Sequence, residues 1–335
     1  MGRLLALLLA LTAGLAQAED VHAQQRRLGR GLNMGNCLEA PSEGAWGVRI
    51  REGDFANIRR AGFDSVRIPV RWSAHAGKVP PFAIDPAFAS RVESVVRDAL
   101  AAGLAVVLNV HHYEELDKEP LAHRARLVGI WRQVSERYRG FPGELQFEVY
   151  NEPHGAHTPE IWNETLGLAL AEIRRHHPVR AVHVGGVEWS QAHTLAKLRL
   201  PADDRHLIGH FHCYAPFAFT HQGAEWVSDT AKWIGRGWQG TESERAEVAK
   251  VLDTAAAWSQ ATGRPVYLGE FGSYGKHAEM DSRARWTRFV AREAERRGIS
   301  WAYWEYQAGF GAWDPKARSW RAPLLQALLP GAGER

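Results

Sequence analysis

Short apolar runs alternate with longer amphipathic segments along most of the chain. The short runs are rich in Val, Ile, Leu and aromatic residues, and several are apolar almost throughout, as expected for parallel strands buried on both faces. On this pattern we expect strands at residues 31–35, 65–70, 105–111, 145–151, 181–187, 207–214, 266–271 and 300–305.

The segments between these strands repeat their apolar positions with helical period. We expect helices at residues 86–103, 124–138, 159–175, 243–261 and 281–297, and helix ends at Gly62, Gly103, Gly263 and Gly298. Such alternation of strands and helices is typical of the α/β class and favours a single (β/α)8 TIM barrel over a doubly wound sheet. No G-x-G-x-x-G motif follows a predicted strand, which weakens the dinucleotide-binding alternative.

The N-terminus has the pattern of a secretory signal peptide. One Arg precedes an apolar run that begins at Leu4, and Ala16-Gln17-Ala18 fits the small-x-small cleavage rule. The run is shorter than the ~20 apolar residues that a spanning helix needs. We therefore assign residues 1–18 to a signal peptide and residues 19–335 to one catalytic domain. We expect a secreted or periplasmic protein that is not held by a membrane after cleavage.

Composition narrows the class of partner. The net charge is only +3 and the basic residues are dispersed, so no nucleic-acid footprint is expected. The 14 Trp and 8 Tyr exceed what a core needs, and exposed Trp faces commonly grip sugar rings. Cys37 and Cys213 lie in distant strand-end segments without metal-binding spacing, so we expect two buried thiols rather than a disulfide. We expect a monomer without a cofactor or metal.

Barrel active sites form at the carboxyl ends of the strands. The polar and aromatic residues collected there are Asn36, Glu39, Arg67, His111, His112, Asn151, Glu152, Trp189, His212, Tyr214, Glu270, Trp304 and Glu305. Residues 215–240 hold three further Trp residues and are expected to form a large loop over the barrel mouth.

Two carboxylates on predicted strands 4 and 7 suit glycoside cleavage. Carboxyl groups ~5 Å apart allow Glu270 to attack the anomeric carbon while Glu152 protonates the leaving oxygen. The acid needs a raised pKa, and Arg67 and Tyr214 are placed to keep the nucleophile charged. Asn151 could donate to the sugar 2-hydroxyl, and Trp304 would form an apolar floor for a pyranose ring.

The chain resembles glycoside hydrolase family 5, in particular its thermophile-type endoglucanase and mannanase branch, over nearly all of residues 29–330. The segments that carry the resemblance are RGLNMGNCLEAPSEGAWGV, GFDSVRIPVRWSAHA, LAVVLNVHHYEEL, FEVYNEPHG, HFHCYAPFAFTHQGAEW, PVYLGEFGSYG and AYWEYQAGFGAWDP. Cys37, where the branch usually has a small residue, and Gln307-Ala308 depart from the branch pattern.

The resemblance implies Glu152 as acid/base and Glu270 as nucleophile. It places Arg67, His111, Asn151, His212, Tyr214 and Trp304 around the sugar at the cleavage point. It further implies that the glycan is held by Asn36, Glu39, His112, Trp189, His221, Trp226 and Glu305.

We expect a retaining endo-β-1,4-glucanase that cuts internal bonds of a soluble or amorphous β-linked polysaccharide. Endo-β-1,4-mannanase and broad β-glucanase or xyloglucanase activity stay open as alternatives. A metal-dependent hydrolase is disfavoured, because the adjacent His111 and His112 would point to opposite sides of a strand. A non-catalytic sugar-binding barrel is disfavoured because both carboxylates and their neighbours are present.

Overall fold

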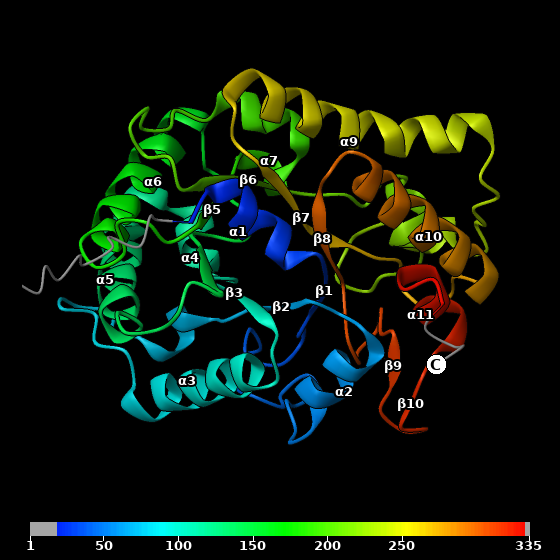
Figure 1. Cartoon of the computed structure of the whole chain (residues 1–335), viewed down its shortest axis with the longest axis horizontal. Coiled ribbons are helices and arrows are strands. Elements are labelled where there is room, and N and C mark those ends of the chain that lie inside the picture. Colours follow the sequence, from blue (N-terminus) through cyan, green and yellow to red (C-terminus); the bar gives the residue numbers. More distant parts are fainter. Residues whose placement is uncertain (1–18, 332–335) are drawn as a thin grey trace, which may run out of the picture.

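A computed structural model of the chain describes residues 19–331 and shows a closed barrel of parallel strands in chain order (Figure 1). The strands are β1 (Arg30–Asn33), β2 (Ser65–Ile68), β3 (Ala105–Asn109), β4 (Leu145–Glu148), β5 (Val182–Gly185), β6 (Leu207–His212), β7 (Val266–Phe271) and β8 (Ser300–Tyr303). β1 pairs with both β2 and β8, which closes the ring. The predicted single (β/α)8 TIM barrel is confirmed.

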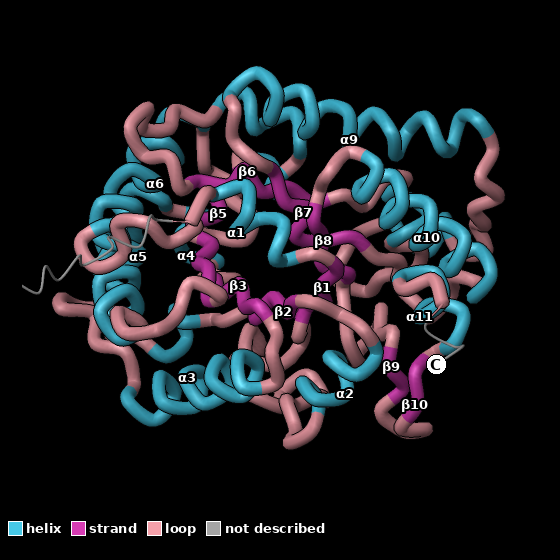
Figure 2. Tube along the Cα trace, viewed as in Figure 1, coloured by secondary structure: helices cyan, strands magenta, loops and turns pink. Residues whose placement is uncertain are grey.

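Helices surround the barrel on its outside (Figure 2). The longer ones are α2 (Asp54–Ala61), α3 (Pro86–Ala101), α5 (Pro120–Arg137), α6 (Pro159–Arg174), α9 (Glu242–Thr262), α10 (Met280–Arg296) and α11 (Ala322–Leu328). Short helices and 3-10 turns sit in the connections: η1 (Trp72–His75), α4 (Glu114–Lys118), α7 (Val187–Ser190), η2 (Ala192–Lys197), α8 (Phe217–Thr220) and η3 (Thr230–Trp233).

The helix boundaries follow from local chemistry. Proline occupies the first turn of α3, α5 and α6, where its missing N–H is not needed. Thr241 forms a capping box with Glu244 at the start of α9. The expected helix-ending glycines, Gly62, Gly103, Gly263 and Gly298, all take positive φ angles.

One helix that the sequence pattern did not predict closes the end of the barrel opposite the strand carboxyl ends. Helix α1 (Val21–Leu28) lies across the barrel in Figure 1. Its Val21 and Leu28 are buried in a small apolar cluster with barrel residues such as Val107 and Ile208. The Gln25 side chain donates to the backbone oxygen of Val266 at the start of β7. This closure leaves the strand carboxyl ends as the open side.

All observed strands except β7 end earlier than predicted. β3 ends at Asn109 and β4 at Glu148, so the predicted site residues His111, Asn151 and Glu152 lie just past the regular ladder. The irregular backbone stays bonded to its neighbours: His111 N donates to Val70 O, and Asn151 N donates to Val110 O. These bonds hold the segments over the barrel end, where their side chains converge.

The expectation of a single loop over the mouth for residues 215–240 was wrong in part. The segment contains α8 and η3, and Trp238 is buried against Phe289 of α10 rather than placed at the mouth. Trp238 is 1% exposed, so its indole belongs to the hydrophobic core. The short hairpin of β9 (Trp313–Asp314) and β10 (Ser319–Trp320) was also not predicted.

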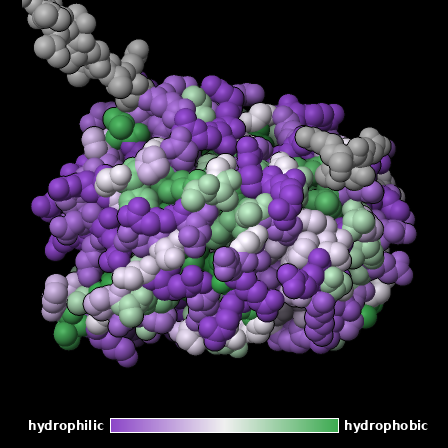
Figure 3. Space-filling model, turned by 60° about the horizontal axis from the view of Figure 1, so that its bottom comes forward, coloured by the Kyte–Doolittle hydropathy of each residue, from purple (hydrophilic) through white to green (hydrophobic). Residues whose placement is uncertain are grey.

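Polar residues cover most of the face shown in Figure 3, with hydrophobic ones in small patches among them. Within residues 19–331, no helix has the length and apolar character required to cross a bilayer. The predicted signal peptide, residues 1–18, lies outside the described residues. Cys37 and Cys213 are both buried and unbridged, as expected.

Candidate active site

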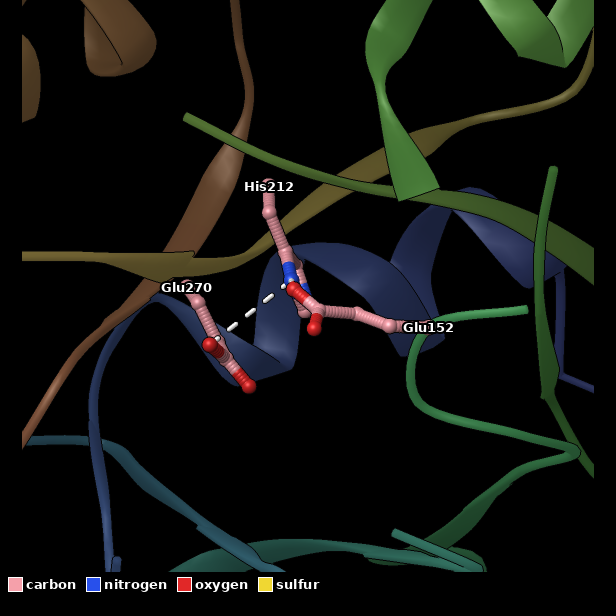
Figure 4. A group of neighbouring side chains, drawn as sticks. All are labelled: Glu152, His212 and Glu270. Carbon is pink, nitrogen blue, oxygen red and sulfur yellow. Dashed lines mark hydrogen bonds and ion pairs between the residues drawn. The ribbon is translucent and has the colours of Figure 1, made fainter. Parts of the chain in front are cut away.

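Two carboxylates and one imidazole converge at the open end of the barrel. Glu152 follows β4, His212 ends β6 and Glu270 belongs to β7. One carboxylate oxygen from each glutamate and a ring nitrogen of His212 all lie within 4.8 Å of one another. Figure 4 shows the three side chains pointing toward each other. The Nδ1 atom of His212 lies 2.6 Å from Oε1 of Glu152 and 3.6 Å from Oε2 of Glu270.

Arg67, from β2, binds two groups of the site with one guanidinium. Nη1 donates to Oε1 of Glu270 at 2.7 Å, and Nη2 donates to Oδ1 of Asn151 at 2.6 Å. Because Arg67 occupies the amide oxygen, Asn151 keeps its NH2 group to donate to a bound ligand. Tyr214 donates its hydroxyl to Oε2 of Glu270 at 2.8 Å. Both predicted neighbours of Glu270 are therefore in contact with it.

The two carboxylates differ in exposure. The Glu152 side chain is 24% exposed, whereas the Glu270 side chain is 6% exposed. Burial raises the pKa of Glu152 to about 7, against the lowering effect of the Arg67 charge. A carboxyl group with this pKa carries its proton in a useful fraction of molecules near neutral pH, as a general acid requires.

The sequence pattern led us to expect Arg67 and Tyr214 to keep Glu270 charged, but it gave no sign of the burial that opposes them. Burial raises the pKa of Glu270 above its ordinary value, and the Arg67 charge and the Tyr214 hydrogen bond offset that effect only in part. Burial cannot be judged from a strand residue alone, which explains the miss. Glu152 also contributes, because its negative charge raises the pKa of Glu270.

His212 is held in one orientation by a second histidine. The Nε2 atoms of His210 and His212 are 3.0 Å apart, and Nδ1 of His210 is buried without a partner. A buried acceptor without a partner is more common than a buried N–H without one. We therefore assign His210 as the donor, which leaves Nδ1–H of His212 to donate to Glu152. Burial lowers the pKa of His212 to about 4, so the ring is neutral.

Glu148 and two asparagines form a polar layer below the site that sequence reasoning missed. Glu148 of β4 accepts two hydrogen bonds from Arg67, and Asn109 of β3 donates to its Oε1 at 2.9 Å. Asn33 of β1 accepts from Nη1 of Arg67 at 2.8 Å. Burial alone would raise the pKa of Glu148, but the charge and hydrogen bonds of Arg67 and the Asn109 hydrogen bond together lower it. A glutamate inside a predicted buried strand was the available signal.

Trp304, after β8, stacks on His111 with ring centroids 5.6 Å apart and an interplanar angle of 10°. Gly35 lies directly against the indole: a Cβ there would be 2.9 Å from its Cζ2 atom. Because Gly35 has no side chain, the protein backbone can pass close to the indole of Trp304. Trp304 is partly exposed, as a floor for a sugar ring must be.

Trp189 lies near Glu152, on the connection that follows β5. Glu188, Trp189 and Ser190 all take left-handed backbone angles, with φ between 54° and 58°. Such a run is unusual outside glycine and is held here by the neighbouring segment. Trp189 N donates to Pro153 O, and Ser190 Oγ donates to Asn151 O. The indole is 53% exposed and stacks on His154, two residues after Glu152.

Trp226 and His221 lie on the connection after β6. The Trp226 indole is 59% exposed and packs against the rings of His221 and Tyr274. Tyr274 donates to Glu225, and Lys276 forms an ion pair with the same carboxylate. The ring of His221 lies 4.9 Å from that of Tyr214. These contacts connect the loop to the wall that carries Tyr214.

Glu39 and Glu305 are buried and bind backbone rather than facing the mouth. Glu39 accepts from the backbone N–H groups of Asn36 and Cys37. Glu305 accepts from the N–H groups of Gln307, Ala308 and Phe310. Burial raises the pKa of Glu39 to about 8 and that of Glu305 to about 7. Both brace loops, and their contact with a glycan stays a prediction.

The donor set of Glu152, His212 and Glu270 could also be read as metal ligands. The interaction partners point to another use, because these groups are bound to each other, to Arg67 and to Tyr214. His111 and His112 do not form a pair of ligands: their rings meet edge to face at 82°, and Nδ1 of His111 is bonded to Asn109. The arrangement suits proton transfer and nucleophilic attack.

Comparison with known proteins identifies the family. The model of the cellulase family, glycosyl hydrolase family 5, matches residues 30–309. The chain belongs to glycosyl hydrolase family 5. The predicted family and the predicted enzyme class, a glycoside hydrolase, are confirmed.

Several relatives are similar over most of this chain. Endoglucanase H of Acetivibrio thermocellus is 37% identical over 323 residues, which are 94% of this chain and 34% of that protein. The chain therefore spans about a third of the length of this curated relative. A solved structure of Thermotoga maritima Cel5A in complex with cellobiose is 46% identical, with a TM-score of 0.90, and covers 92% of this chain and 100% of that one. The same Thermotoga maritima protein was solved with a mannotriose substrate.

Proposed function

We propose that this family 5 chain is an endo-β-1,4-glucanase that cleaves with net retention, with Glu152 as general acid/base and Glu270 as nucleophile. The observation that carries the proposal is the spacing of the two carboxylates, whose nearest oxygens lie within 4.8 Å. Retaining glycosidases place the carboxyl groups ~5–5.5 Å apart, and inverting ones ~6.5–9.5 Å apart to admit a water.

In the first step, a carboxylate oxygen of Glu270 forms a bond to the anomeric carbon as the bond from that carbon to the leaving oxygen breaks. Glu152 gives its proton to the leaving oxygen, which departs as an alcohol. The Nδ1–H group of His212 binds Oε1 of Glu152, so the proton of the acid resides on Oε2. That oxygen is free to donate.

In the second step, Glu152 acts as the base. Its carboxylate takes a proton from a water whose oxygen attacks the anomeric carbon, and the bond to Glu270 breaks. As Glu270 becomes a carboxylate again, Arg67 and Tyr214 stabilise its negative charge through the hydrogen bonds already present. The amide NH2 of Asn151 is placed to donate to the 2-hydroxyl of the sugar, an interaction that strengthens in the transition state.

We infer a β-1,4-glucan as the main substrate, because the proteins to which this chain is similar include endoglucanases and a cellobiose complex. Mannan is the second candidate, favoured by the mannotriose complex of Thermotoga maritima Cel5A. Glucose and mannose differ at the 2-hydroxyl, which Asn151 would contact. The exposed indoles Trp189 and Trp226 supply the apolar faces that β-linked chains bind, which supports a polymer rather than a small glycoside as substrate.

One experiment tests substrate and stereochemistry together. Reducing-end release is measured side by side on carboxymethylcellulose, barley glucan and galactomannan, and proton NMR follows the first anomer formed from a soluble cello-oligosaccharide. We expect faster release from the glucans and initial formation of the β-anomer. Inactivity on both glucans would overturn the substrate, and an initial α-anomer would overturn the mechanism.

We also infer that residues 1–18 are a signal peptide, that the exported domain starts near Glu19, and that the protein acts as a monomer. The charged start, short apolar run and Ala-Gln-Ala motif of the sequence support export. N-terminal sequencing of the secreted protein should begin at Glu19, and light scattering should give the mass of one chain. A retained N-terminus or a dimer mass would contradict these inferences.

A further inference from the structure

Trp46 is an exposed indole at the edge of the site that neither the sequence reasoning nor the proposed mechanism uses. It belongs to the connection between β1 and α2, and 44% of its surface is exposed. Its ring centroid lies 5.8 Å from that of His112, with the two planes at 69°. A large apolar side chain left in contact with an active-site histidine is a candidate ligand surface.

A row of rings leads from the floor of the site to this indole. Trp304 stacks on His111, whose ring centroid lies 4.6 Å from that of His112. His112 in turn contacts Trp46. If Trp304 carries the sugar at the cleavage point, a chain that follows this row reaches Trp46 next. Among the exposed large hydrophobic residues of the described range, 19–331, Trp46 is the one that belongs to this row.

This direction leads away from the leaving group. The acid Glu152 and its neighbour Trp189 lie on the connections after β4 and β5, whereas Trp46 follows β1. In a closed barrel with strands in the order β1 to β8, β1 and β5 are opposite each other. Trp189 is therefore on the side that receives the departing chain, and Trp46 is on the side of the chain that stays bound to Glu270.

The segment that carries Trp46 is held in place before any ligand arrives. Arg91 of α3 forms two hydrogen bonds of 2.9 Å with the carboxylate of Glu43, and it also donates to the backbone oxygen of Ile50. The backbone N–H of Ile50 donates to Glu43 as well. The Arg91 hydrogen bond outweighs burial and lowers the pKa of Glu43, so this carboxylate stays charged. Both ends of the Trp46 segment are thus fixed to the same helix.

We propose that Trp46 is a binding platform for the glycone part of a β-1,4-linked chain, beyond the sugar whose bond is cleaved, and that the Glu43–Arg91 pair positions it. The inference rests on the proposed function. Sugars joined by β-1,4 bonds present C–H groups on both ring faces, and stacking on an indole removes apolar surface from water. A fixed segment loses little conformational entropy when the sugar binds.

The test uses three substrates with one dinitrophenyl leaving group: the β-glucoside, the β-cellobioside and the β-cellotrioside. The readout is the ratio of kcat/KM for the cellotrioside to kcat/KM for the glucoside. In Trp46→Ala this ratio should fall about tenfold relative to the wild type. Trp46→Phe keeps an aromatic face and should retain most of the ratio. An unchanged ratio in Trp46→Ala would overturn the proposal.

Arg91→Met tests the positioning role with the same readout. The ratio should fall by less than in Trp46→Ala, and the double variant should show no further fall, because both changes act on one platform. Arg132→Met, which breaks the exposed pair with Glu172 on the far helices α5 and α6, is the matched control and should keep the wild-type ratio. Additive falls in the double variant would contradict the positioning role.

The outcomes also separate this inference from the function on which it rests. Wild-type protein that hydrolyses none of the three substrates would overturn the proposed function and the platform together. Wild-type hydrolysis with the same length dependence in Trp46→Ala would overturn the platform alone.

Discussion

Arg67 and Glu148 form a bidentate ion pair inside the barrel, with Nε to Oε2 and Nη2 to Oε1 distances of 2.7 Å each. Neither side chain has any exposed surface. The charge of Arg67 is therefore already matched by Glu148 when Glu270 binds to Nη1. Burial keeps the pKa of the proposed nucleophile raised although a guanidinium touches it.

Glu148→Leu should lower the free energy of unfolding by about 3–5 kcal/mol, because it breaks a buried ion pair and removes the acceptor of one Asn109 N–H. Denaturant-induced unfolding measures this change. The control is again Arg132→Met, which removes an exposed pair of the kind that contributes little. A loss in Glu148→Leu no larger than in the control would show that the interior pair is not a stabilising contact.

The pH dependence of kcat/KM should be bell-shaped. The pH values at which activity falls on either side should both lie above the usual pKa of a carboxyl group. Activity needs protonated Glu152 and is lost as pH rises through its pKa of about 7. It also needs ionised Glu270 and is lost as pH falls through a pKa raised by burial. Glu152→Gln should lose the alkaline limb on a dinitrophenyl glycoside, whose leaving group needs no acid. If the alkaline limb persists in Glu152→Gln, the titration of another group causes it.

His210 never touches the substrate in this account, and it acts by orienting His212. In His210→Leu, the ring proton of His212 can move from Nδ1 to Nε2. Nδ1 then accepts a hydrogen bond from protonated Glu152, which stabilises the neutral acid. The kcat/KM plateau should fall about tenfold, and the alkaline limb should move to higher pH. His210→Gln keeps a donor and should recover both. A lowered plateau with an unmoved limb would indicate a packing role only.

The two cysteines should behave as buried free thiols. Burial raises the pKa of Cys213 to about 12 and that of Cys37 well above its usual value, so little reactive thiolate forms. A thiol reagent should modify neither residue rapidly in the folded protein and both after denaturation. The melting temperature should be the same with and without a reductant. A shift on reduction would show that the two are bridged.

Much of the fold was readable from the sequence because a parallel barrel repeats one pattern. Buried strands such as β7, predicted at its observed bounds, read as apolar runs whatever surrounds them. Helix ends were found where a glycine must take a positive φ angle, as at Gly263. Glu152 and Glu270 were brought together because the carboxyl ends of parallel strands all meet at one end of a barrel.

Other features depend on distant partners and could not be read locally. Glu148 and Glu39 look like ordinary acidic residues until the structure shows the guanidinium or backbone N–H groups that bind them. Helix α1 is short and polar in composition, and it forms because its few apolar side chains fill the end of the barrel. Trp46 keeps one side exposed because the segment around it is fixed. The Arg91 contacts that fix this segment join residues far apart in the sequence.

Covalent trapping tests the central claim, that Glu270 is the nucleophile, most directly. A 2-deoxy-2-fluoro-β-cellobioside with a dinitrophenyl leaving group slows the second step, so a glycosyl-enzyme accumulates and can be digested and sequenced by mass spectrometry. We predict one added sugar group on the peptide that contains Glu270, and no label in Glu270→Ala. A label on Glu152 or any other residue, or turnover of natural substrate by Glu270→Ala at the wild-type rate, would contradict the account.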